Sequence, residues 1–197
     1  ANRLWSGQFV KSLAPTSFYP MIAGAARPEQ AAAMVAALQD VRKFGGTWLL
    51  PSVTRDDPAF DDNVYWRGRI WPPLNFLVWH GLRRYGFDRE ARALADNGWR
   101  LFQGEWRRHR RCPENFNAVT GAAMDQADTG SFYGWGALMP WLAAAELADF
   151  NPWHGWEINH EGAPLRHGPF RTPTGLAALS GQDGILTLSL DGAPVFA

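Results

Sequence analysis

Three amphipathic segments, with long aromatic loops before the second and after the third, limit what this chain can fold into. The first, residues 28–44, carries Met34, Val35, Leu38 and Val41 on one stripe. Two further stripes comprise Leu74, Leu77, Val78, Leu82 and Tyr85, and then Ala91, Leu94, Ala95, Gly98, Leu101 and Phe102. This spacing is typical of helices that bury one face. The sequence therefore predicts helices paired as hairpins and joined by long loops.

Prolines and glycines mark the ends of these predicted helices. Proline fits the first turn of a helix, and glycine often follows the last. The predicted starts are Pro28 and Pro72-Pro73, Asp88 is the predicted cap of the third helix, and the predicted stops are Gly45-Gly46 and Gly86. A fourth helix ends in "WLAAAELADF" and either starts near residue 138 or bends at Pro140.

The composition changes after about residue 150. Leucines alternate with polar residues in "GILTLSLDGAPVF", and Asp191-Gly192 is a turn signal. This pattern predicts a strand and a hairpin. We therefore expect a helical domain over residues 1–150 and a small β tail over 151–197.

Charge and composition narrow the class of protein. With 19 basic and 19 acidic residues the formal net charge is zero, which predicts no nucleic acid partner. No apolar run is long enough for a membrane span, and the start of the sequence shows no export signal, so we expect a cytoplasmic protein. The 5 histidines form no i, i+4 pair, and we expect neither a metal nor a cofactor.

Residues 65–86, "YWRGRIWPPLNFLVWHGLRRYG", combine aromatic rings with arginines. Indole faces pack on apolar C–H surfaces, and guanidinium groups donate planar hydrogen bonds, so together they suit a sugar ring. Two plainer interpretations stay open. Tyr65, Trp66 and Trp71 suit core anchors, and Arg67 and Arg69 suit surface residues or partners of Asp61 and Asp62.

A second loop, residues 112–131, contains Glu114 in "PENFN". A carboxylate among amides and aromatic rings suits a general base that activates water. Arginines 107, 108, 110 and 111 favour its charged form, although a solvated loop and a helix end complemented by basic residues explain the same pattern. The same arginines favour a lowered thiol pKa at Cys112, but without a histidine partner we expect no nucleophile there.

Three stretches of the sequence resemble a known family. They are "LAPTSFYPMIAGAARPEQAAAMV", "LPSVTRDDPAFDDNVYWRGRIWPPLNFLVWHGLRRYG" and "ENFNAVTG…SFYGWGALM". In this order they resemble the C-terminal half of the catalytic domain of glycoside hydrolase family 63. The resemblance covers nearly residues 13–150 and is closest to the bacterial branch with mannosylglycerate and glucosylglycerate hydrolases.

The resemblance implies an all-α fold, the C-terminal portion of an (α/α)6 barrel, followed here by the small β appendage. It also implies hydrolysis of α-glucosidic or α-mannosidic bonds with inversion, on a small saccharide and without a metal. Glu114 matches the general base of the family. The positions that match its sugar pocket are Tyr65, Trp66, Arg67 and Trp71, with Asn115, Asn117, Tyr133 and Trp135 as pocket wall or support behind it.

The general acid of the family has no match in this sequence. An inverting enzyme needs it about 6.5–9.5 Å from the base, across the sugar. Asp125 and Asp128 match no acid position, and a solvated loop explains both. We therefore expect a fragment whose N-terminal partner half supplies the acid. Alternatives are a non-catalytic carbohydrate-binding or interaction module, and a trehalase-like or debranching α-glucosidase on a similar barrel.

Overall fold

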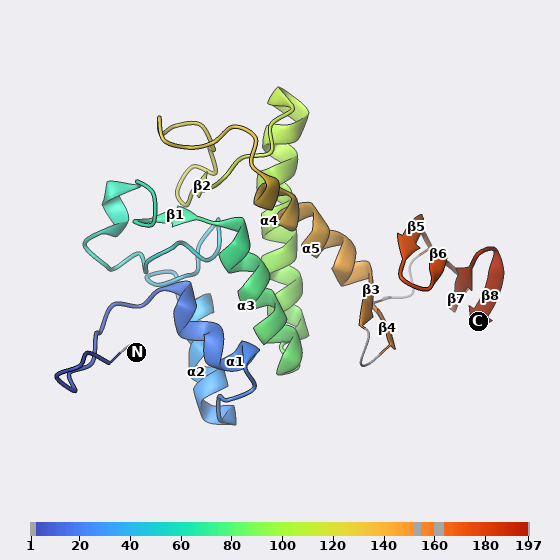
Figure 1. The fold of residues 1–197 in the computed structure, drawn as a ribbon, viewed down its shortest axis with the longest axis horizontal. Helices are drawn as coiled ribbons and strands as arrows, with labels where there is room; N and C mark the ends of the chain where they lie inside the picture. Colours follow the sequence, from blue (N-terminus) through green and yellow to red (C-terminus); the bar gives the residue numbers. More distant parts are fainter. Residues whose placement is uncertain (1–2, 152–154, 160–163, 197) are drawn as a thin grey trace. The chain divides into compact units, whose positions relative to one another are not determined.

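The computed structural model describes residues 3–151, 155–159 and 164–196, and the chain divides into two compact units (Figure 1). The first unit spans residues 1–143 and the second spans residues 144–197. Each unit is described by itself. Residues 152–154, 160–163 and 197 of the predicted β tail lie outside the described part.

The first unit contains helices joined by long loops (Figure 1). Its helices are α1 (Tyr19–Ile22), α2 (Pro28–Gln39), α3 (Pro72–Arg84), α4 (Asp88–His109) and the start of α5 (Leu138–Leu147). Its 3-10 turns are η1 (Pro15–Phe18), η2 (Phe60–Asp62) and η3 (Gly134–Ala137), and its short strands are β1 (Arg69–Ile70) and β2 (Phe116–Asn117).

Helices α3 and α4 form the helical hairpin that the sequence predicts. Gly86 follows α3 with φ +73°, the Gly86 N–H donates to the Arg83 carbonyl (3.1 Å), and the Phe87 N–H donates to the Leu82 carbonyl (3.0 Å). These two bonds are the pair of a Schellman cap, which satisfies the last carbonyls of a helix. Arg83 also pairs with Asp88 at 2.8 Å across the turn. The predicted stop at Gly86 is confirmed, whereas Asp88 is the first residue of α4 and the N-cap is Phe87.

Helix α1 packs closely on α3. A Cβ added at Gly81 would lie 3.1 Å from the Met21 Cβ, so the glycine allows the close approach. Arg84 donates to the Ile22 carbonyl (2.9 Å), and the Tyr85 hydroxyl donates to the Ala26 carbonyl (2.7 Å). Side chains at the end of α3 therefore satisfy carbonyls that α1 and its following turn leave open.

Helix α2 is shorter than its apolar stripe predicts. It ends at Gln39, and Asp40 has an extended ψ of 117°. The Asp40 carboxylate accepts the Arg42 N–H (2.9 Å), and its carbonyl accepts the Lys43 N–H (2.8 Å). These local bonds replace the helical ladder, a known tendency of aspartate. Val41 is consequently 68% exposed, so its predicted place on the stripe is wrong.

Two polar side chains hold the long loop between α2 and β1. The Asn97 side chain on α4 donates to the Thr47 carbonyl (2.8 Å) and accepts the Leu49 N–H (2.9 Å). Arg55 donates to the carbonyls of three residues: Gly45 at 2.6 Å, Trp48 at 2.6 Å and Ala118 at 3.1 Å. The loop is therefore tied to the helical framework through its own backbone.

Strands β1 and β2 bring two distant loops together over an apolar core. They pair antiparallel, with Arg69 opposite Asn117 and Ile70 opposite Phe116. The buried core around this pair comprises Phe60, Ile70, Leu101, Phe116, Ala118, Ala123 and Met139. The loop that contains Glu114 therefore lies next to the aromatic segment, over this buried core.

The second unit is formed mainly by antiparallel strands. Its strands are β3 (Ala148–Asn151), β4 (Gly155–Ile158), β5 (Leu165–Thr172), β6 (Gly175–Gln182), β7 (Ile185–Leu190) and β8 (Ala193–Phe196). Strands β3 and β4 pair with each other, and β5 to β8 form a four-stranded sheet in sequence order. The predicted hairpin at Asp191-Gly192 is confirmed as the β7–β8 connection.

The all-α fold class is wrong. About 39% of the residues are helical and 24% lie in strands, so the strands are a substantial part of the chain. The strands form a sheet because burial alternates along β6. Ala177 and Leu179 of β6 and Leu188 of β7 are buried together in a small core of the second unit. The predicted β7–β8 hairpin is therefore only one part of a four-stranded sheet.

Candidate active site

A tight turn presents the aromatic residues ahead of β1. The Val64 and Arg67 backbones exchange hydrogen bonds of 3.1 and 2.9 Å, which leaves Tyr65 and Trp66 at the tip. Tyr65 has φ +48°, a left-handed conformation that is uncommon for a bulky residue. Gly68 has φ +98°, and an added Cβ would overlap the Phe60 carbonyl, so only glycine fits there.

The rings at this turn form a stack with one buried and two exposed members. Trp66 stacks on Trp71 with ring centroids 3.9 Å apart and planes inclined by 16°, and Tyr65 packs edge-on against Trp71 at 5.3 Å. Trp71 is fully buried, and its Nε1–H donates to the Tyr65 carbonyl (3.0 Å). Tyr65 is 51% exposed and Trp66 is 39% exposed. The core-anchor interpretation therefore fits Trp71, whereas the other two rings face outward.

The aromatic stack continues to the loop that carries Glu114. The Trp135 ring lies 5.9 Å from the Trp71 ring, and Tyr133 packs on Trp135 at 4.3 Å. The Trp135 Nε1–H donates to the Glu114 carbonyl (3.0 Å). One indole therefore links the aromatic turn directly to the backbone of the predicted base.

Glu114 is partly buried and is held at both its backbone and its side chain by Gly130. The Glu114 N–H donates to the Gly130 carbonyl (2.9 Å), and the Gly130 N–H donates to the Glu114 Oε2 (3.0 Å). Within the described part of the chain, no hydrogen bond to Oε1 is formed. This geometry orients a carboxylate and leaves one oxygen for a ligand or water.

The arginines at the end of α4 lie at or near the surface of the first unit. Arg107, Arg108 and Arg110 are exposed, and Arg110 donates to the Trp106 carbonyl (3.3 Å). Among the described residues, none of these arginines forms an ion pair with Glu114. They complement the carbonyl end of the helix, which is the plainer of the two interpretations.

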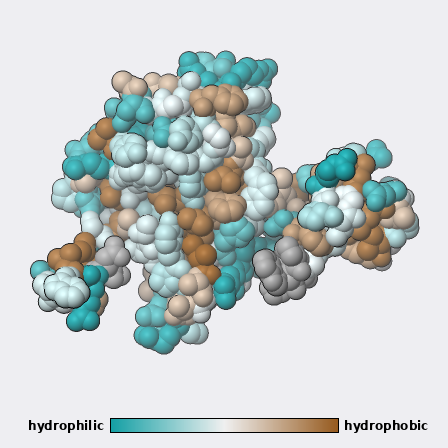
Figure 2. Space-filling model, in the orientation of Figure 1, coloured by the Kyte–Doolittle hydropathy of each residue, from teal (hydrophilic) through white to brown (hydrophobic). Residues whose placement is uncertain are grey.

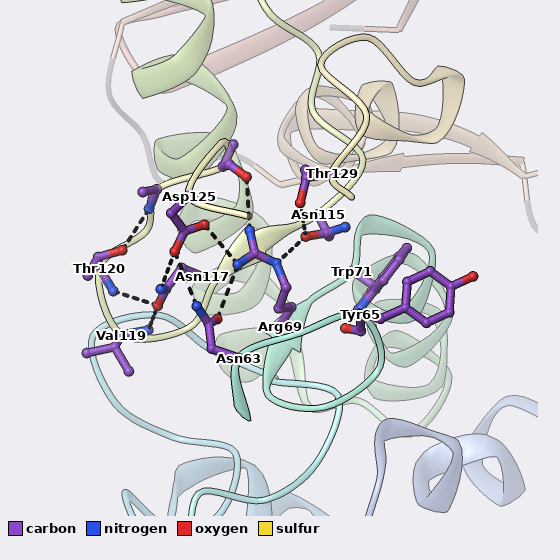
Figure 3. A network of polar contacts seen from close by, with 12 residues as sticks. Asn63, Tyr65, Arg69, Trp71, Asn115, Asn117, Val119, Thr120, Asp125 and Thr129 are labelled. Atoms are coloured by element: carbon purple, nitrogen blue, oxygen red, sulfur yellow. Dashed lines mark hydrogen bonds and ion pairs between the residues drawn. The ribbon is translucent and has the colours of Figure 1, made fainter. Parts of the chain in front are cut away.

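Asn115 and Asn117 lie within a buried polar network around Arg69 (Figure 3). The Arg69 Nε–H donates to the Asn115 Oδ1, and its Nη1 lies 2.8 Å from the Asp125 Oδ1. The Asn117 amide donates to the Asp125 Oδ2 (2.6 Å). Both predicted site asparagines therefore have partners inside the protein, and they support the loop from behind.

The same network decides the protonation of Asp125. Burial raises the pKa of this carboxyl, but hydrogen bonds from Asn117 and Arg69 and the charge of Arg69 outweigh it, so its pKa lies below the ordinary value. An ionised, ion-paired carboxylate is a poor proton donor at neutral pH. Asp125 is therefore an unsuitable general acid.

Arg67 and Cys112 have simpler surroundings. Arg67 is exposed and pairs with Asp62, one of the partners that the sequence suggests. Burial raises the pKa of the Cys112 thiol, and its Sγ–H donates to the Tyr133 carbonyl (3.3 Å), so the expected lowering of its pKa is wrong. Cys112 is buried beside the loop and is not an activated thiol.

No three His, Cys, Asp or Glu side chains in the described ranges are grouped so as to hold a metal ion. None of the described helices is both long and apolar enough to cross a membrane.

Comparison with known proteins places this chain in a family. A family profile described as "Mannosylglycerate hydrolase MGH1-like glycoside hydrolase domain" matches residues 2–136. The chain is 31% identical to the mannosylglycerate hydrolase of Thermus thermophilus over 138 residues, 69% of this chain and 30% of that enzyme. It is 40% identical to the cytosolic neutral trehalase of Neurospora crassa over 83 residues, 41% of this chain and 11% of that enzyme.

A solved structure agrees with these matches. The GH63 mannosylglycerate hydrolase from Thermus thermophilus in complex with glucose superposes with a TM-score of 0.58 and 26% identity, over 70% of this chain and 32% of that chain. The fold and the sequence of the first unit thus define the class as a glycoside hydrolase domain. The chain belongs to glycoside hydrolase family 63, in its mannosylglycerate hydrolase MGH1-like group. It spans no more than 30% of the length of the first curated relatives it matches.

Several residues that shape the site carry no obvious signal in the sequence. Arg69 stood out only as a surface arginine or a partner of Asp61 or Asp62, and its bonds reach Asn115 and Asp125 instead. Gly130, which holds the Glu114 carboxylate, is one glycine among 20. The register of β1 and β2 places Arg69 opposite Asn117, so even that pairing does not by itself predict the contacts of Arg69 with Asn115 and Asp125.

Proposed function

We propose that the full-length protein hydrolyses an α-glucosidic or α-mannosidic bond with inversion, with Glu114 as the general base. The observation that carries this proposal is the Glu114 carboxylate, held by Gly130 and joined through Trp135 to partly exposed aromatic rings. In the proposed reaction the carboxylate takes a proton from water as the water attacks the anomeric carbon.

The aromatic residues would bind the sugar from one side. Trp66 and Tyr65 expose their rings at the tip of the turn, and Tyr133 is 41% exposed on the Glu114 side. Trp71 packs against Trp66, and Trp135 packs against Tyr133. The exposed Arg67 would donate hydrogen bonds to hydroxyls or to an anionic aglycone.

The proposal assigns the general acid to a part of the protein outside these 197 residues. The chain spans less than a third of the length of its relatives, and Asp125 is committed to its ion pair with Arg69. The helical hairpin of α3 and α4 would then join further hairpins in an (α/α)6 barrel. The saccharide would lie between the missing acid and Glu114.

The substrate we propose is a small saccharide, in the first place a mannosylglycerate-type α-glycoside. This choice is supported by the family profile and by the printed name of the Thermus relative. A second candidate is an α-glucoside of the trehalose type, because the identity to the Neurospora trehalase reaches 40% over the matched stretch.

The experiment that tests the proposal is Glu114→Gln in the full-length protein. We expect kcat to fall by at least about 10³-fold while KM changes little, because the amide keeps the shape but cannot accept the proton. Assays would use α-mannosides and α-glucosides, including glycerate conjugates and trehalose. Near-normal turnover in the variant would overturn the assignment of Glu114.

The same panel separates the remaining interpretation. If the unchanged full-length protein binds these sugars but hydrolyses none of them, it is a carbohydrate-binding module and the enzyme proposal fails. A product whose anomeric configuration is retained would contradict inversion.

A further inference from the structure

We infer that Arg69 is a positioning residue for the Glu114 base, acting through Asn115 and the Thr129–Gly130 segment (Figure 3). This inference rests on the proposed function, because it takes Glu114 as the base. It adds a role for a fully buried arginine that has no hydrogen bond to Glu114 among the described residues.

Arg69 joins the segments that meet behind the site. Its side chain is fully buried, and its three nitrogens are directed toward different partners. Nη2 donates to the Ala123 carbonyl (2.9 Å), Nη1 donates to the Asn63 Oδ1 (3.2 Å) and pairs with Asp125, and Nε donates to the Asn115 side chain. One planar group therefore sets the spacing between the aromatic turn, β2 and the loop that follows it.

The contact with Asn115 is the link to the base. Asn115 directly follows Glu114, and its Oδ1 accepts both the Arg69 Nε–H and the Thr129 hydroxyl (3.3 Å). Gly130, next to Thr129, holds the Glu114 carboxylate and backbone. The Asn115 Oδ1, held by Arg69, thus joins the Glu114–Asn115 segment to the Thr129–Gly130 segment. We call these two segments the Gly130 clamp.

The fork of the arginine is essential to this arrangement. A lysine would keep the charge opposite Asp125, but a single ammonium group cannot also reach Asn115 and the Ala123 carbonyl. Asn115 would then be free to shift, and the Gly130 clamp with it. Because a misplacement of about 1 Å at a catalytic group can cost about 10²-fold in rate, we expect the loss in kcat.

The main experiment compares Arg69→Lys with Arg55→Lys in the full-length protein. Arg55 is a matched control, because it is partly buried and donates to three backbone carbonyls in the same unit. We expect Arg69→Lys to lower kcat by about 10–100-fold with KM changed less than about threefold. We expect Arg55→Lys to keep kcat within about twofold of the unchanged protein, even if its Tm falls as much as that of Arg69→Lys.

A second pair of variants covers the case in which Arg69→Lys fails to fold. Thr129→Val removes the hydroxyl that joins Asn115, and Thr129→Ser restores it. We expect kcat to fall about 3–10-fold in Thr129→Val and to recover in Thr129→Ser, with KM unchanged. Equal kcat in both variants would overturn the inference, as would a loss in Arg69→Lys that appears only in KM or only in proportion to Tm.

A double variant separates this inference from the proposed function. If Arg69 acts through the base, Arg69→Lys should not lower the residual rate of Glu114→Gln any further. A full additional loss in that background would overturn the positioning role. If Glu114→Gln alone keeps normal activity, the proposed function fails; if it is inactive and Arg69→Lys is normal, only the present inference fails.

Discussion

The candidate site has two sides that are built on different physical principles. The aromatic side, residues 64–71, holds its exposed rings by stacking on the buried Trp71. The polar side, residues 114–130, holds Glu114 by hydrogen bonds that lead back to the buried charge of Arg69. The ring contacts are apolar and follow the usual stacked and edge-on arrangements, whereas the hydrogen bonds of the polar side weaken steeply as their angles change.

The difference matches what each side would do to a sugar. Binding a ring face needs an apolar area whose exact position is not critical. Activating water needs a carboxylate at a fixed distance and angle. Figure 2 shows brown apolar patches that interrupt the polar surface of the first unit. We therefore expect changes on the polar side to cost stability and turnover, and changes on the aromatic side to cost mainly binding.

The largest effect is expected where the buried charge pair is broken. Arg69→Met removes the ion-pair partner of Asp125 and the donor to the Ala123 carbonyl, and removal of one partner of a fully buried pair typically costs about 3–5 kcal/mol, an upper bound here because Asp125 is 28% exposed. The free energy of unfolding of the full-length protein would be measured by urea denaturation. The double variant Arg69→Met/Asp125→Leu should recover part of the loss. If Arg69→Met alone is as stable as the unchanged protein, the network does not hold this side.

The pH dependence of stability is the next test of the polar side. The folded-state pKa of Asp125 lies below the value of about 3.9 in unfolded chains, so the unfolded state binds more protons at low pH. Its contribution is therefore present above about pH 5 and is lost as the pH falls through the folded pKa. We expect the stability difference between the unchanged protein and Asp125→Asn to shrink from pH 6 to pH 3. A difference that stays constant over this range would contradict the ionised state of Asp125.

Local sequence patterns predicted the helical framework well. The prolines at Pro28 and Pro72 and the glycine at Gly86 act within one helical turn, so their effects can be identified without knowing the fold. The end of α2 was missed because Asp40 forms a local turn that interrupts an otherwise continuous stripe. The all-α class was wrong because the Asp183-Gly184 turn between β6 and β7 was overlooked, although it carries the same signal as Asp191-Gly192.

The site was only half predictable for a different reason. Residue type identified Glu114 and the aromatic turn, but it could not separate Trp71, which is buried, from Trp66, which is not. Nor could it pair Arg69 with Asp125, because that contact spans more than fifty residues and depends on the register of β1 with β2. Contacts of this kind follow from tertiary structure and not from any periodicity.

On the aromatic side, Trp66→Ala should affect binding more than folding. The variant loses one stacked ring pair, worth about 0.5–1.5 kcal/mol, from a ring that is already 39% exposed. We expect KM to rise about tenfold with kcat changed little. Trp106→Ala is a matched control, because that indole is 40% exposed and stacks on Phe102 at 5.8 Å. If KM is similar in both variants, Trp66 does not bind the sugar.

The smallest effect on folding is expected at Arg67, two residues from the position with the largest. Both arginines pair with an aspartate, but the Arg67 pair is largely exposed whereas the Arg69 side chain is fully buried. Water and salt screen an exposed pair, which typically contributes about 0–1 kcal/mol. Arg67→Gln should therefore leave the urea midpoint almost unchanged, and any loss of activity should appear in KM. A loss of stability close to that of Arg69→Met would show that the exposed Arg67 pair contributes as much as the buried Arg69 network. The proposed difference between the two sides would then fail.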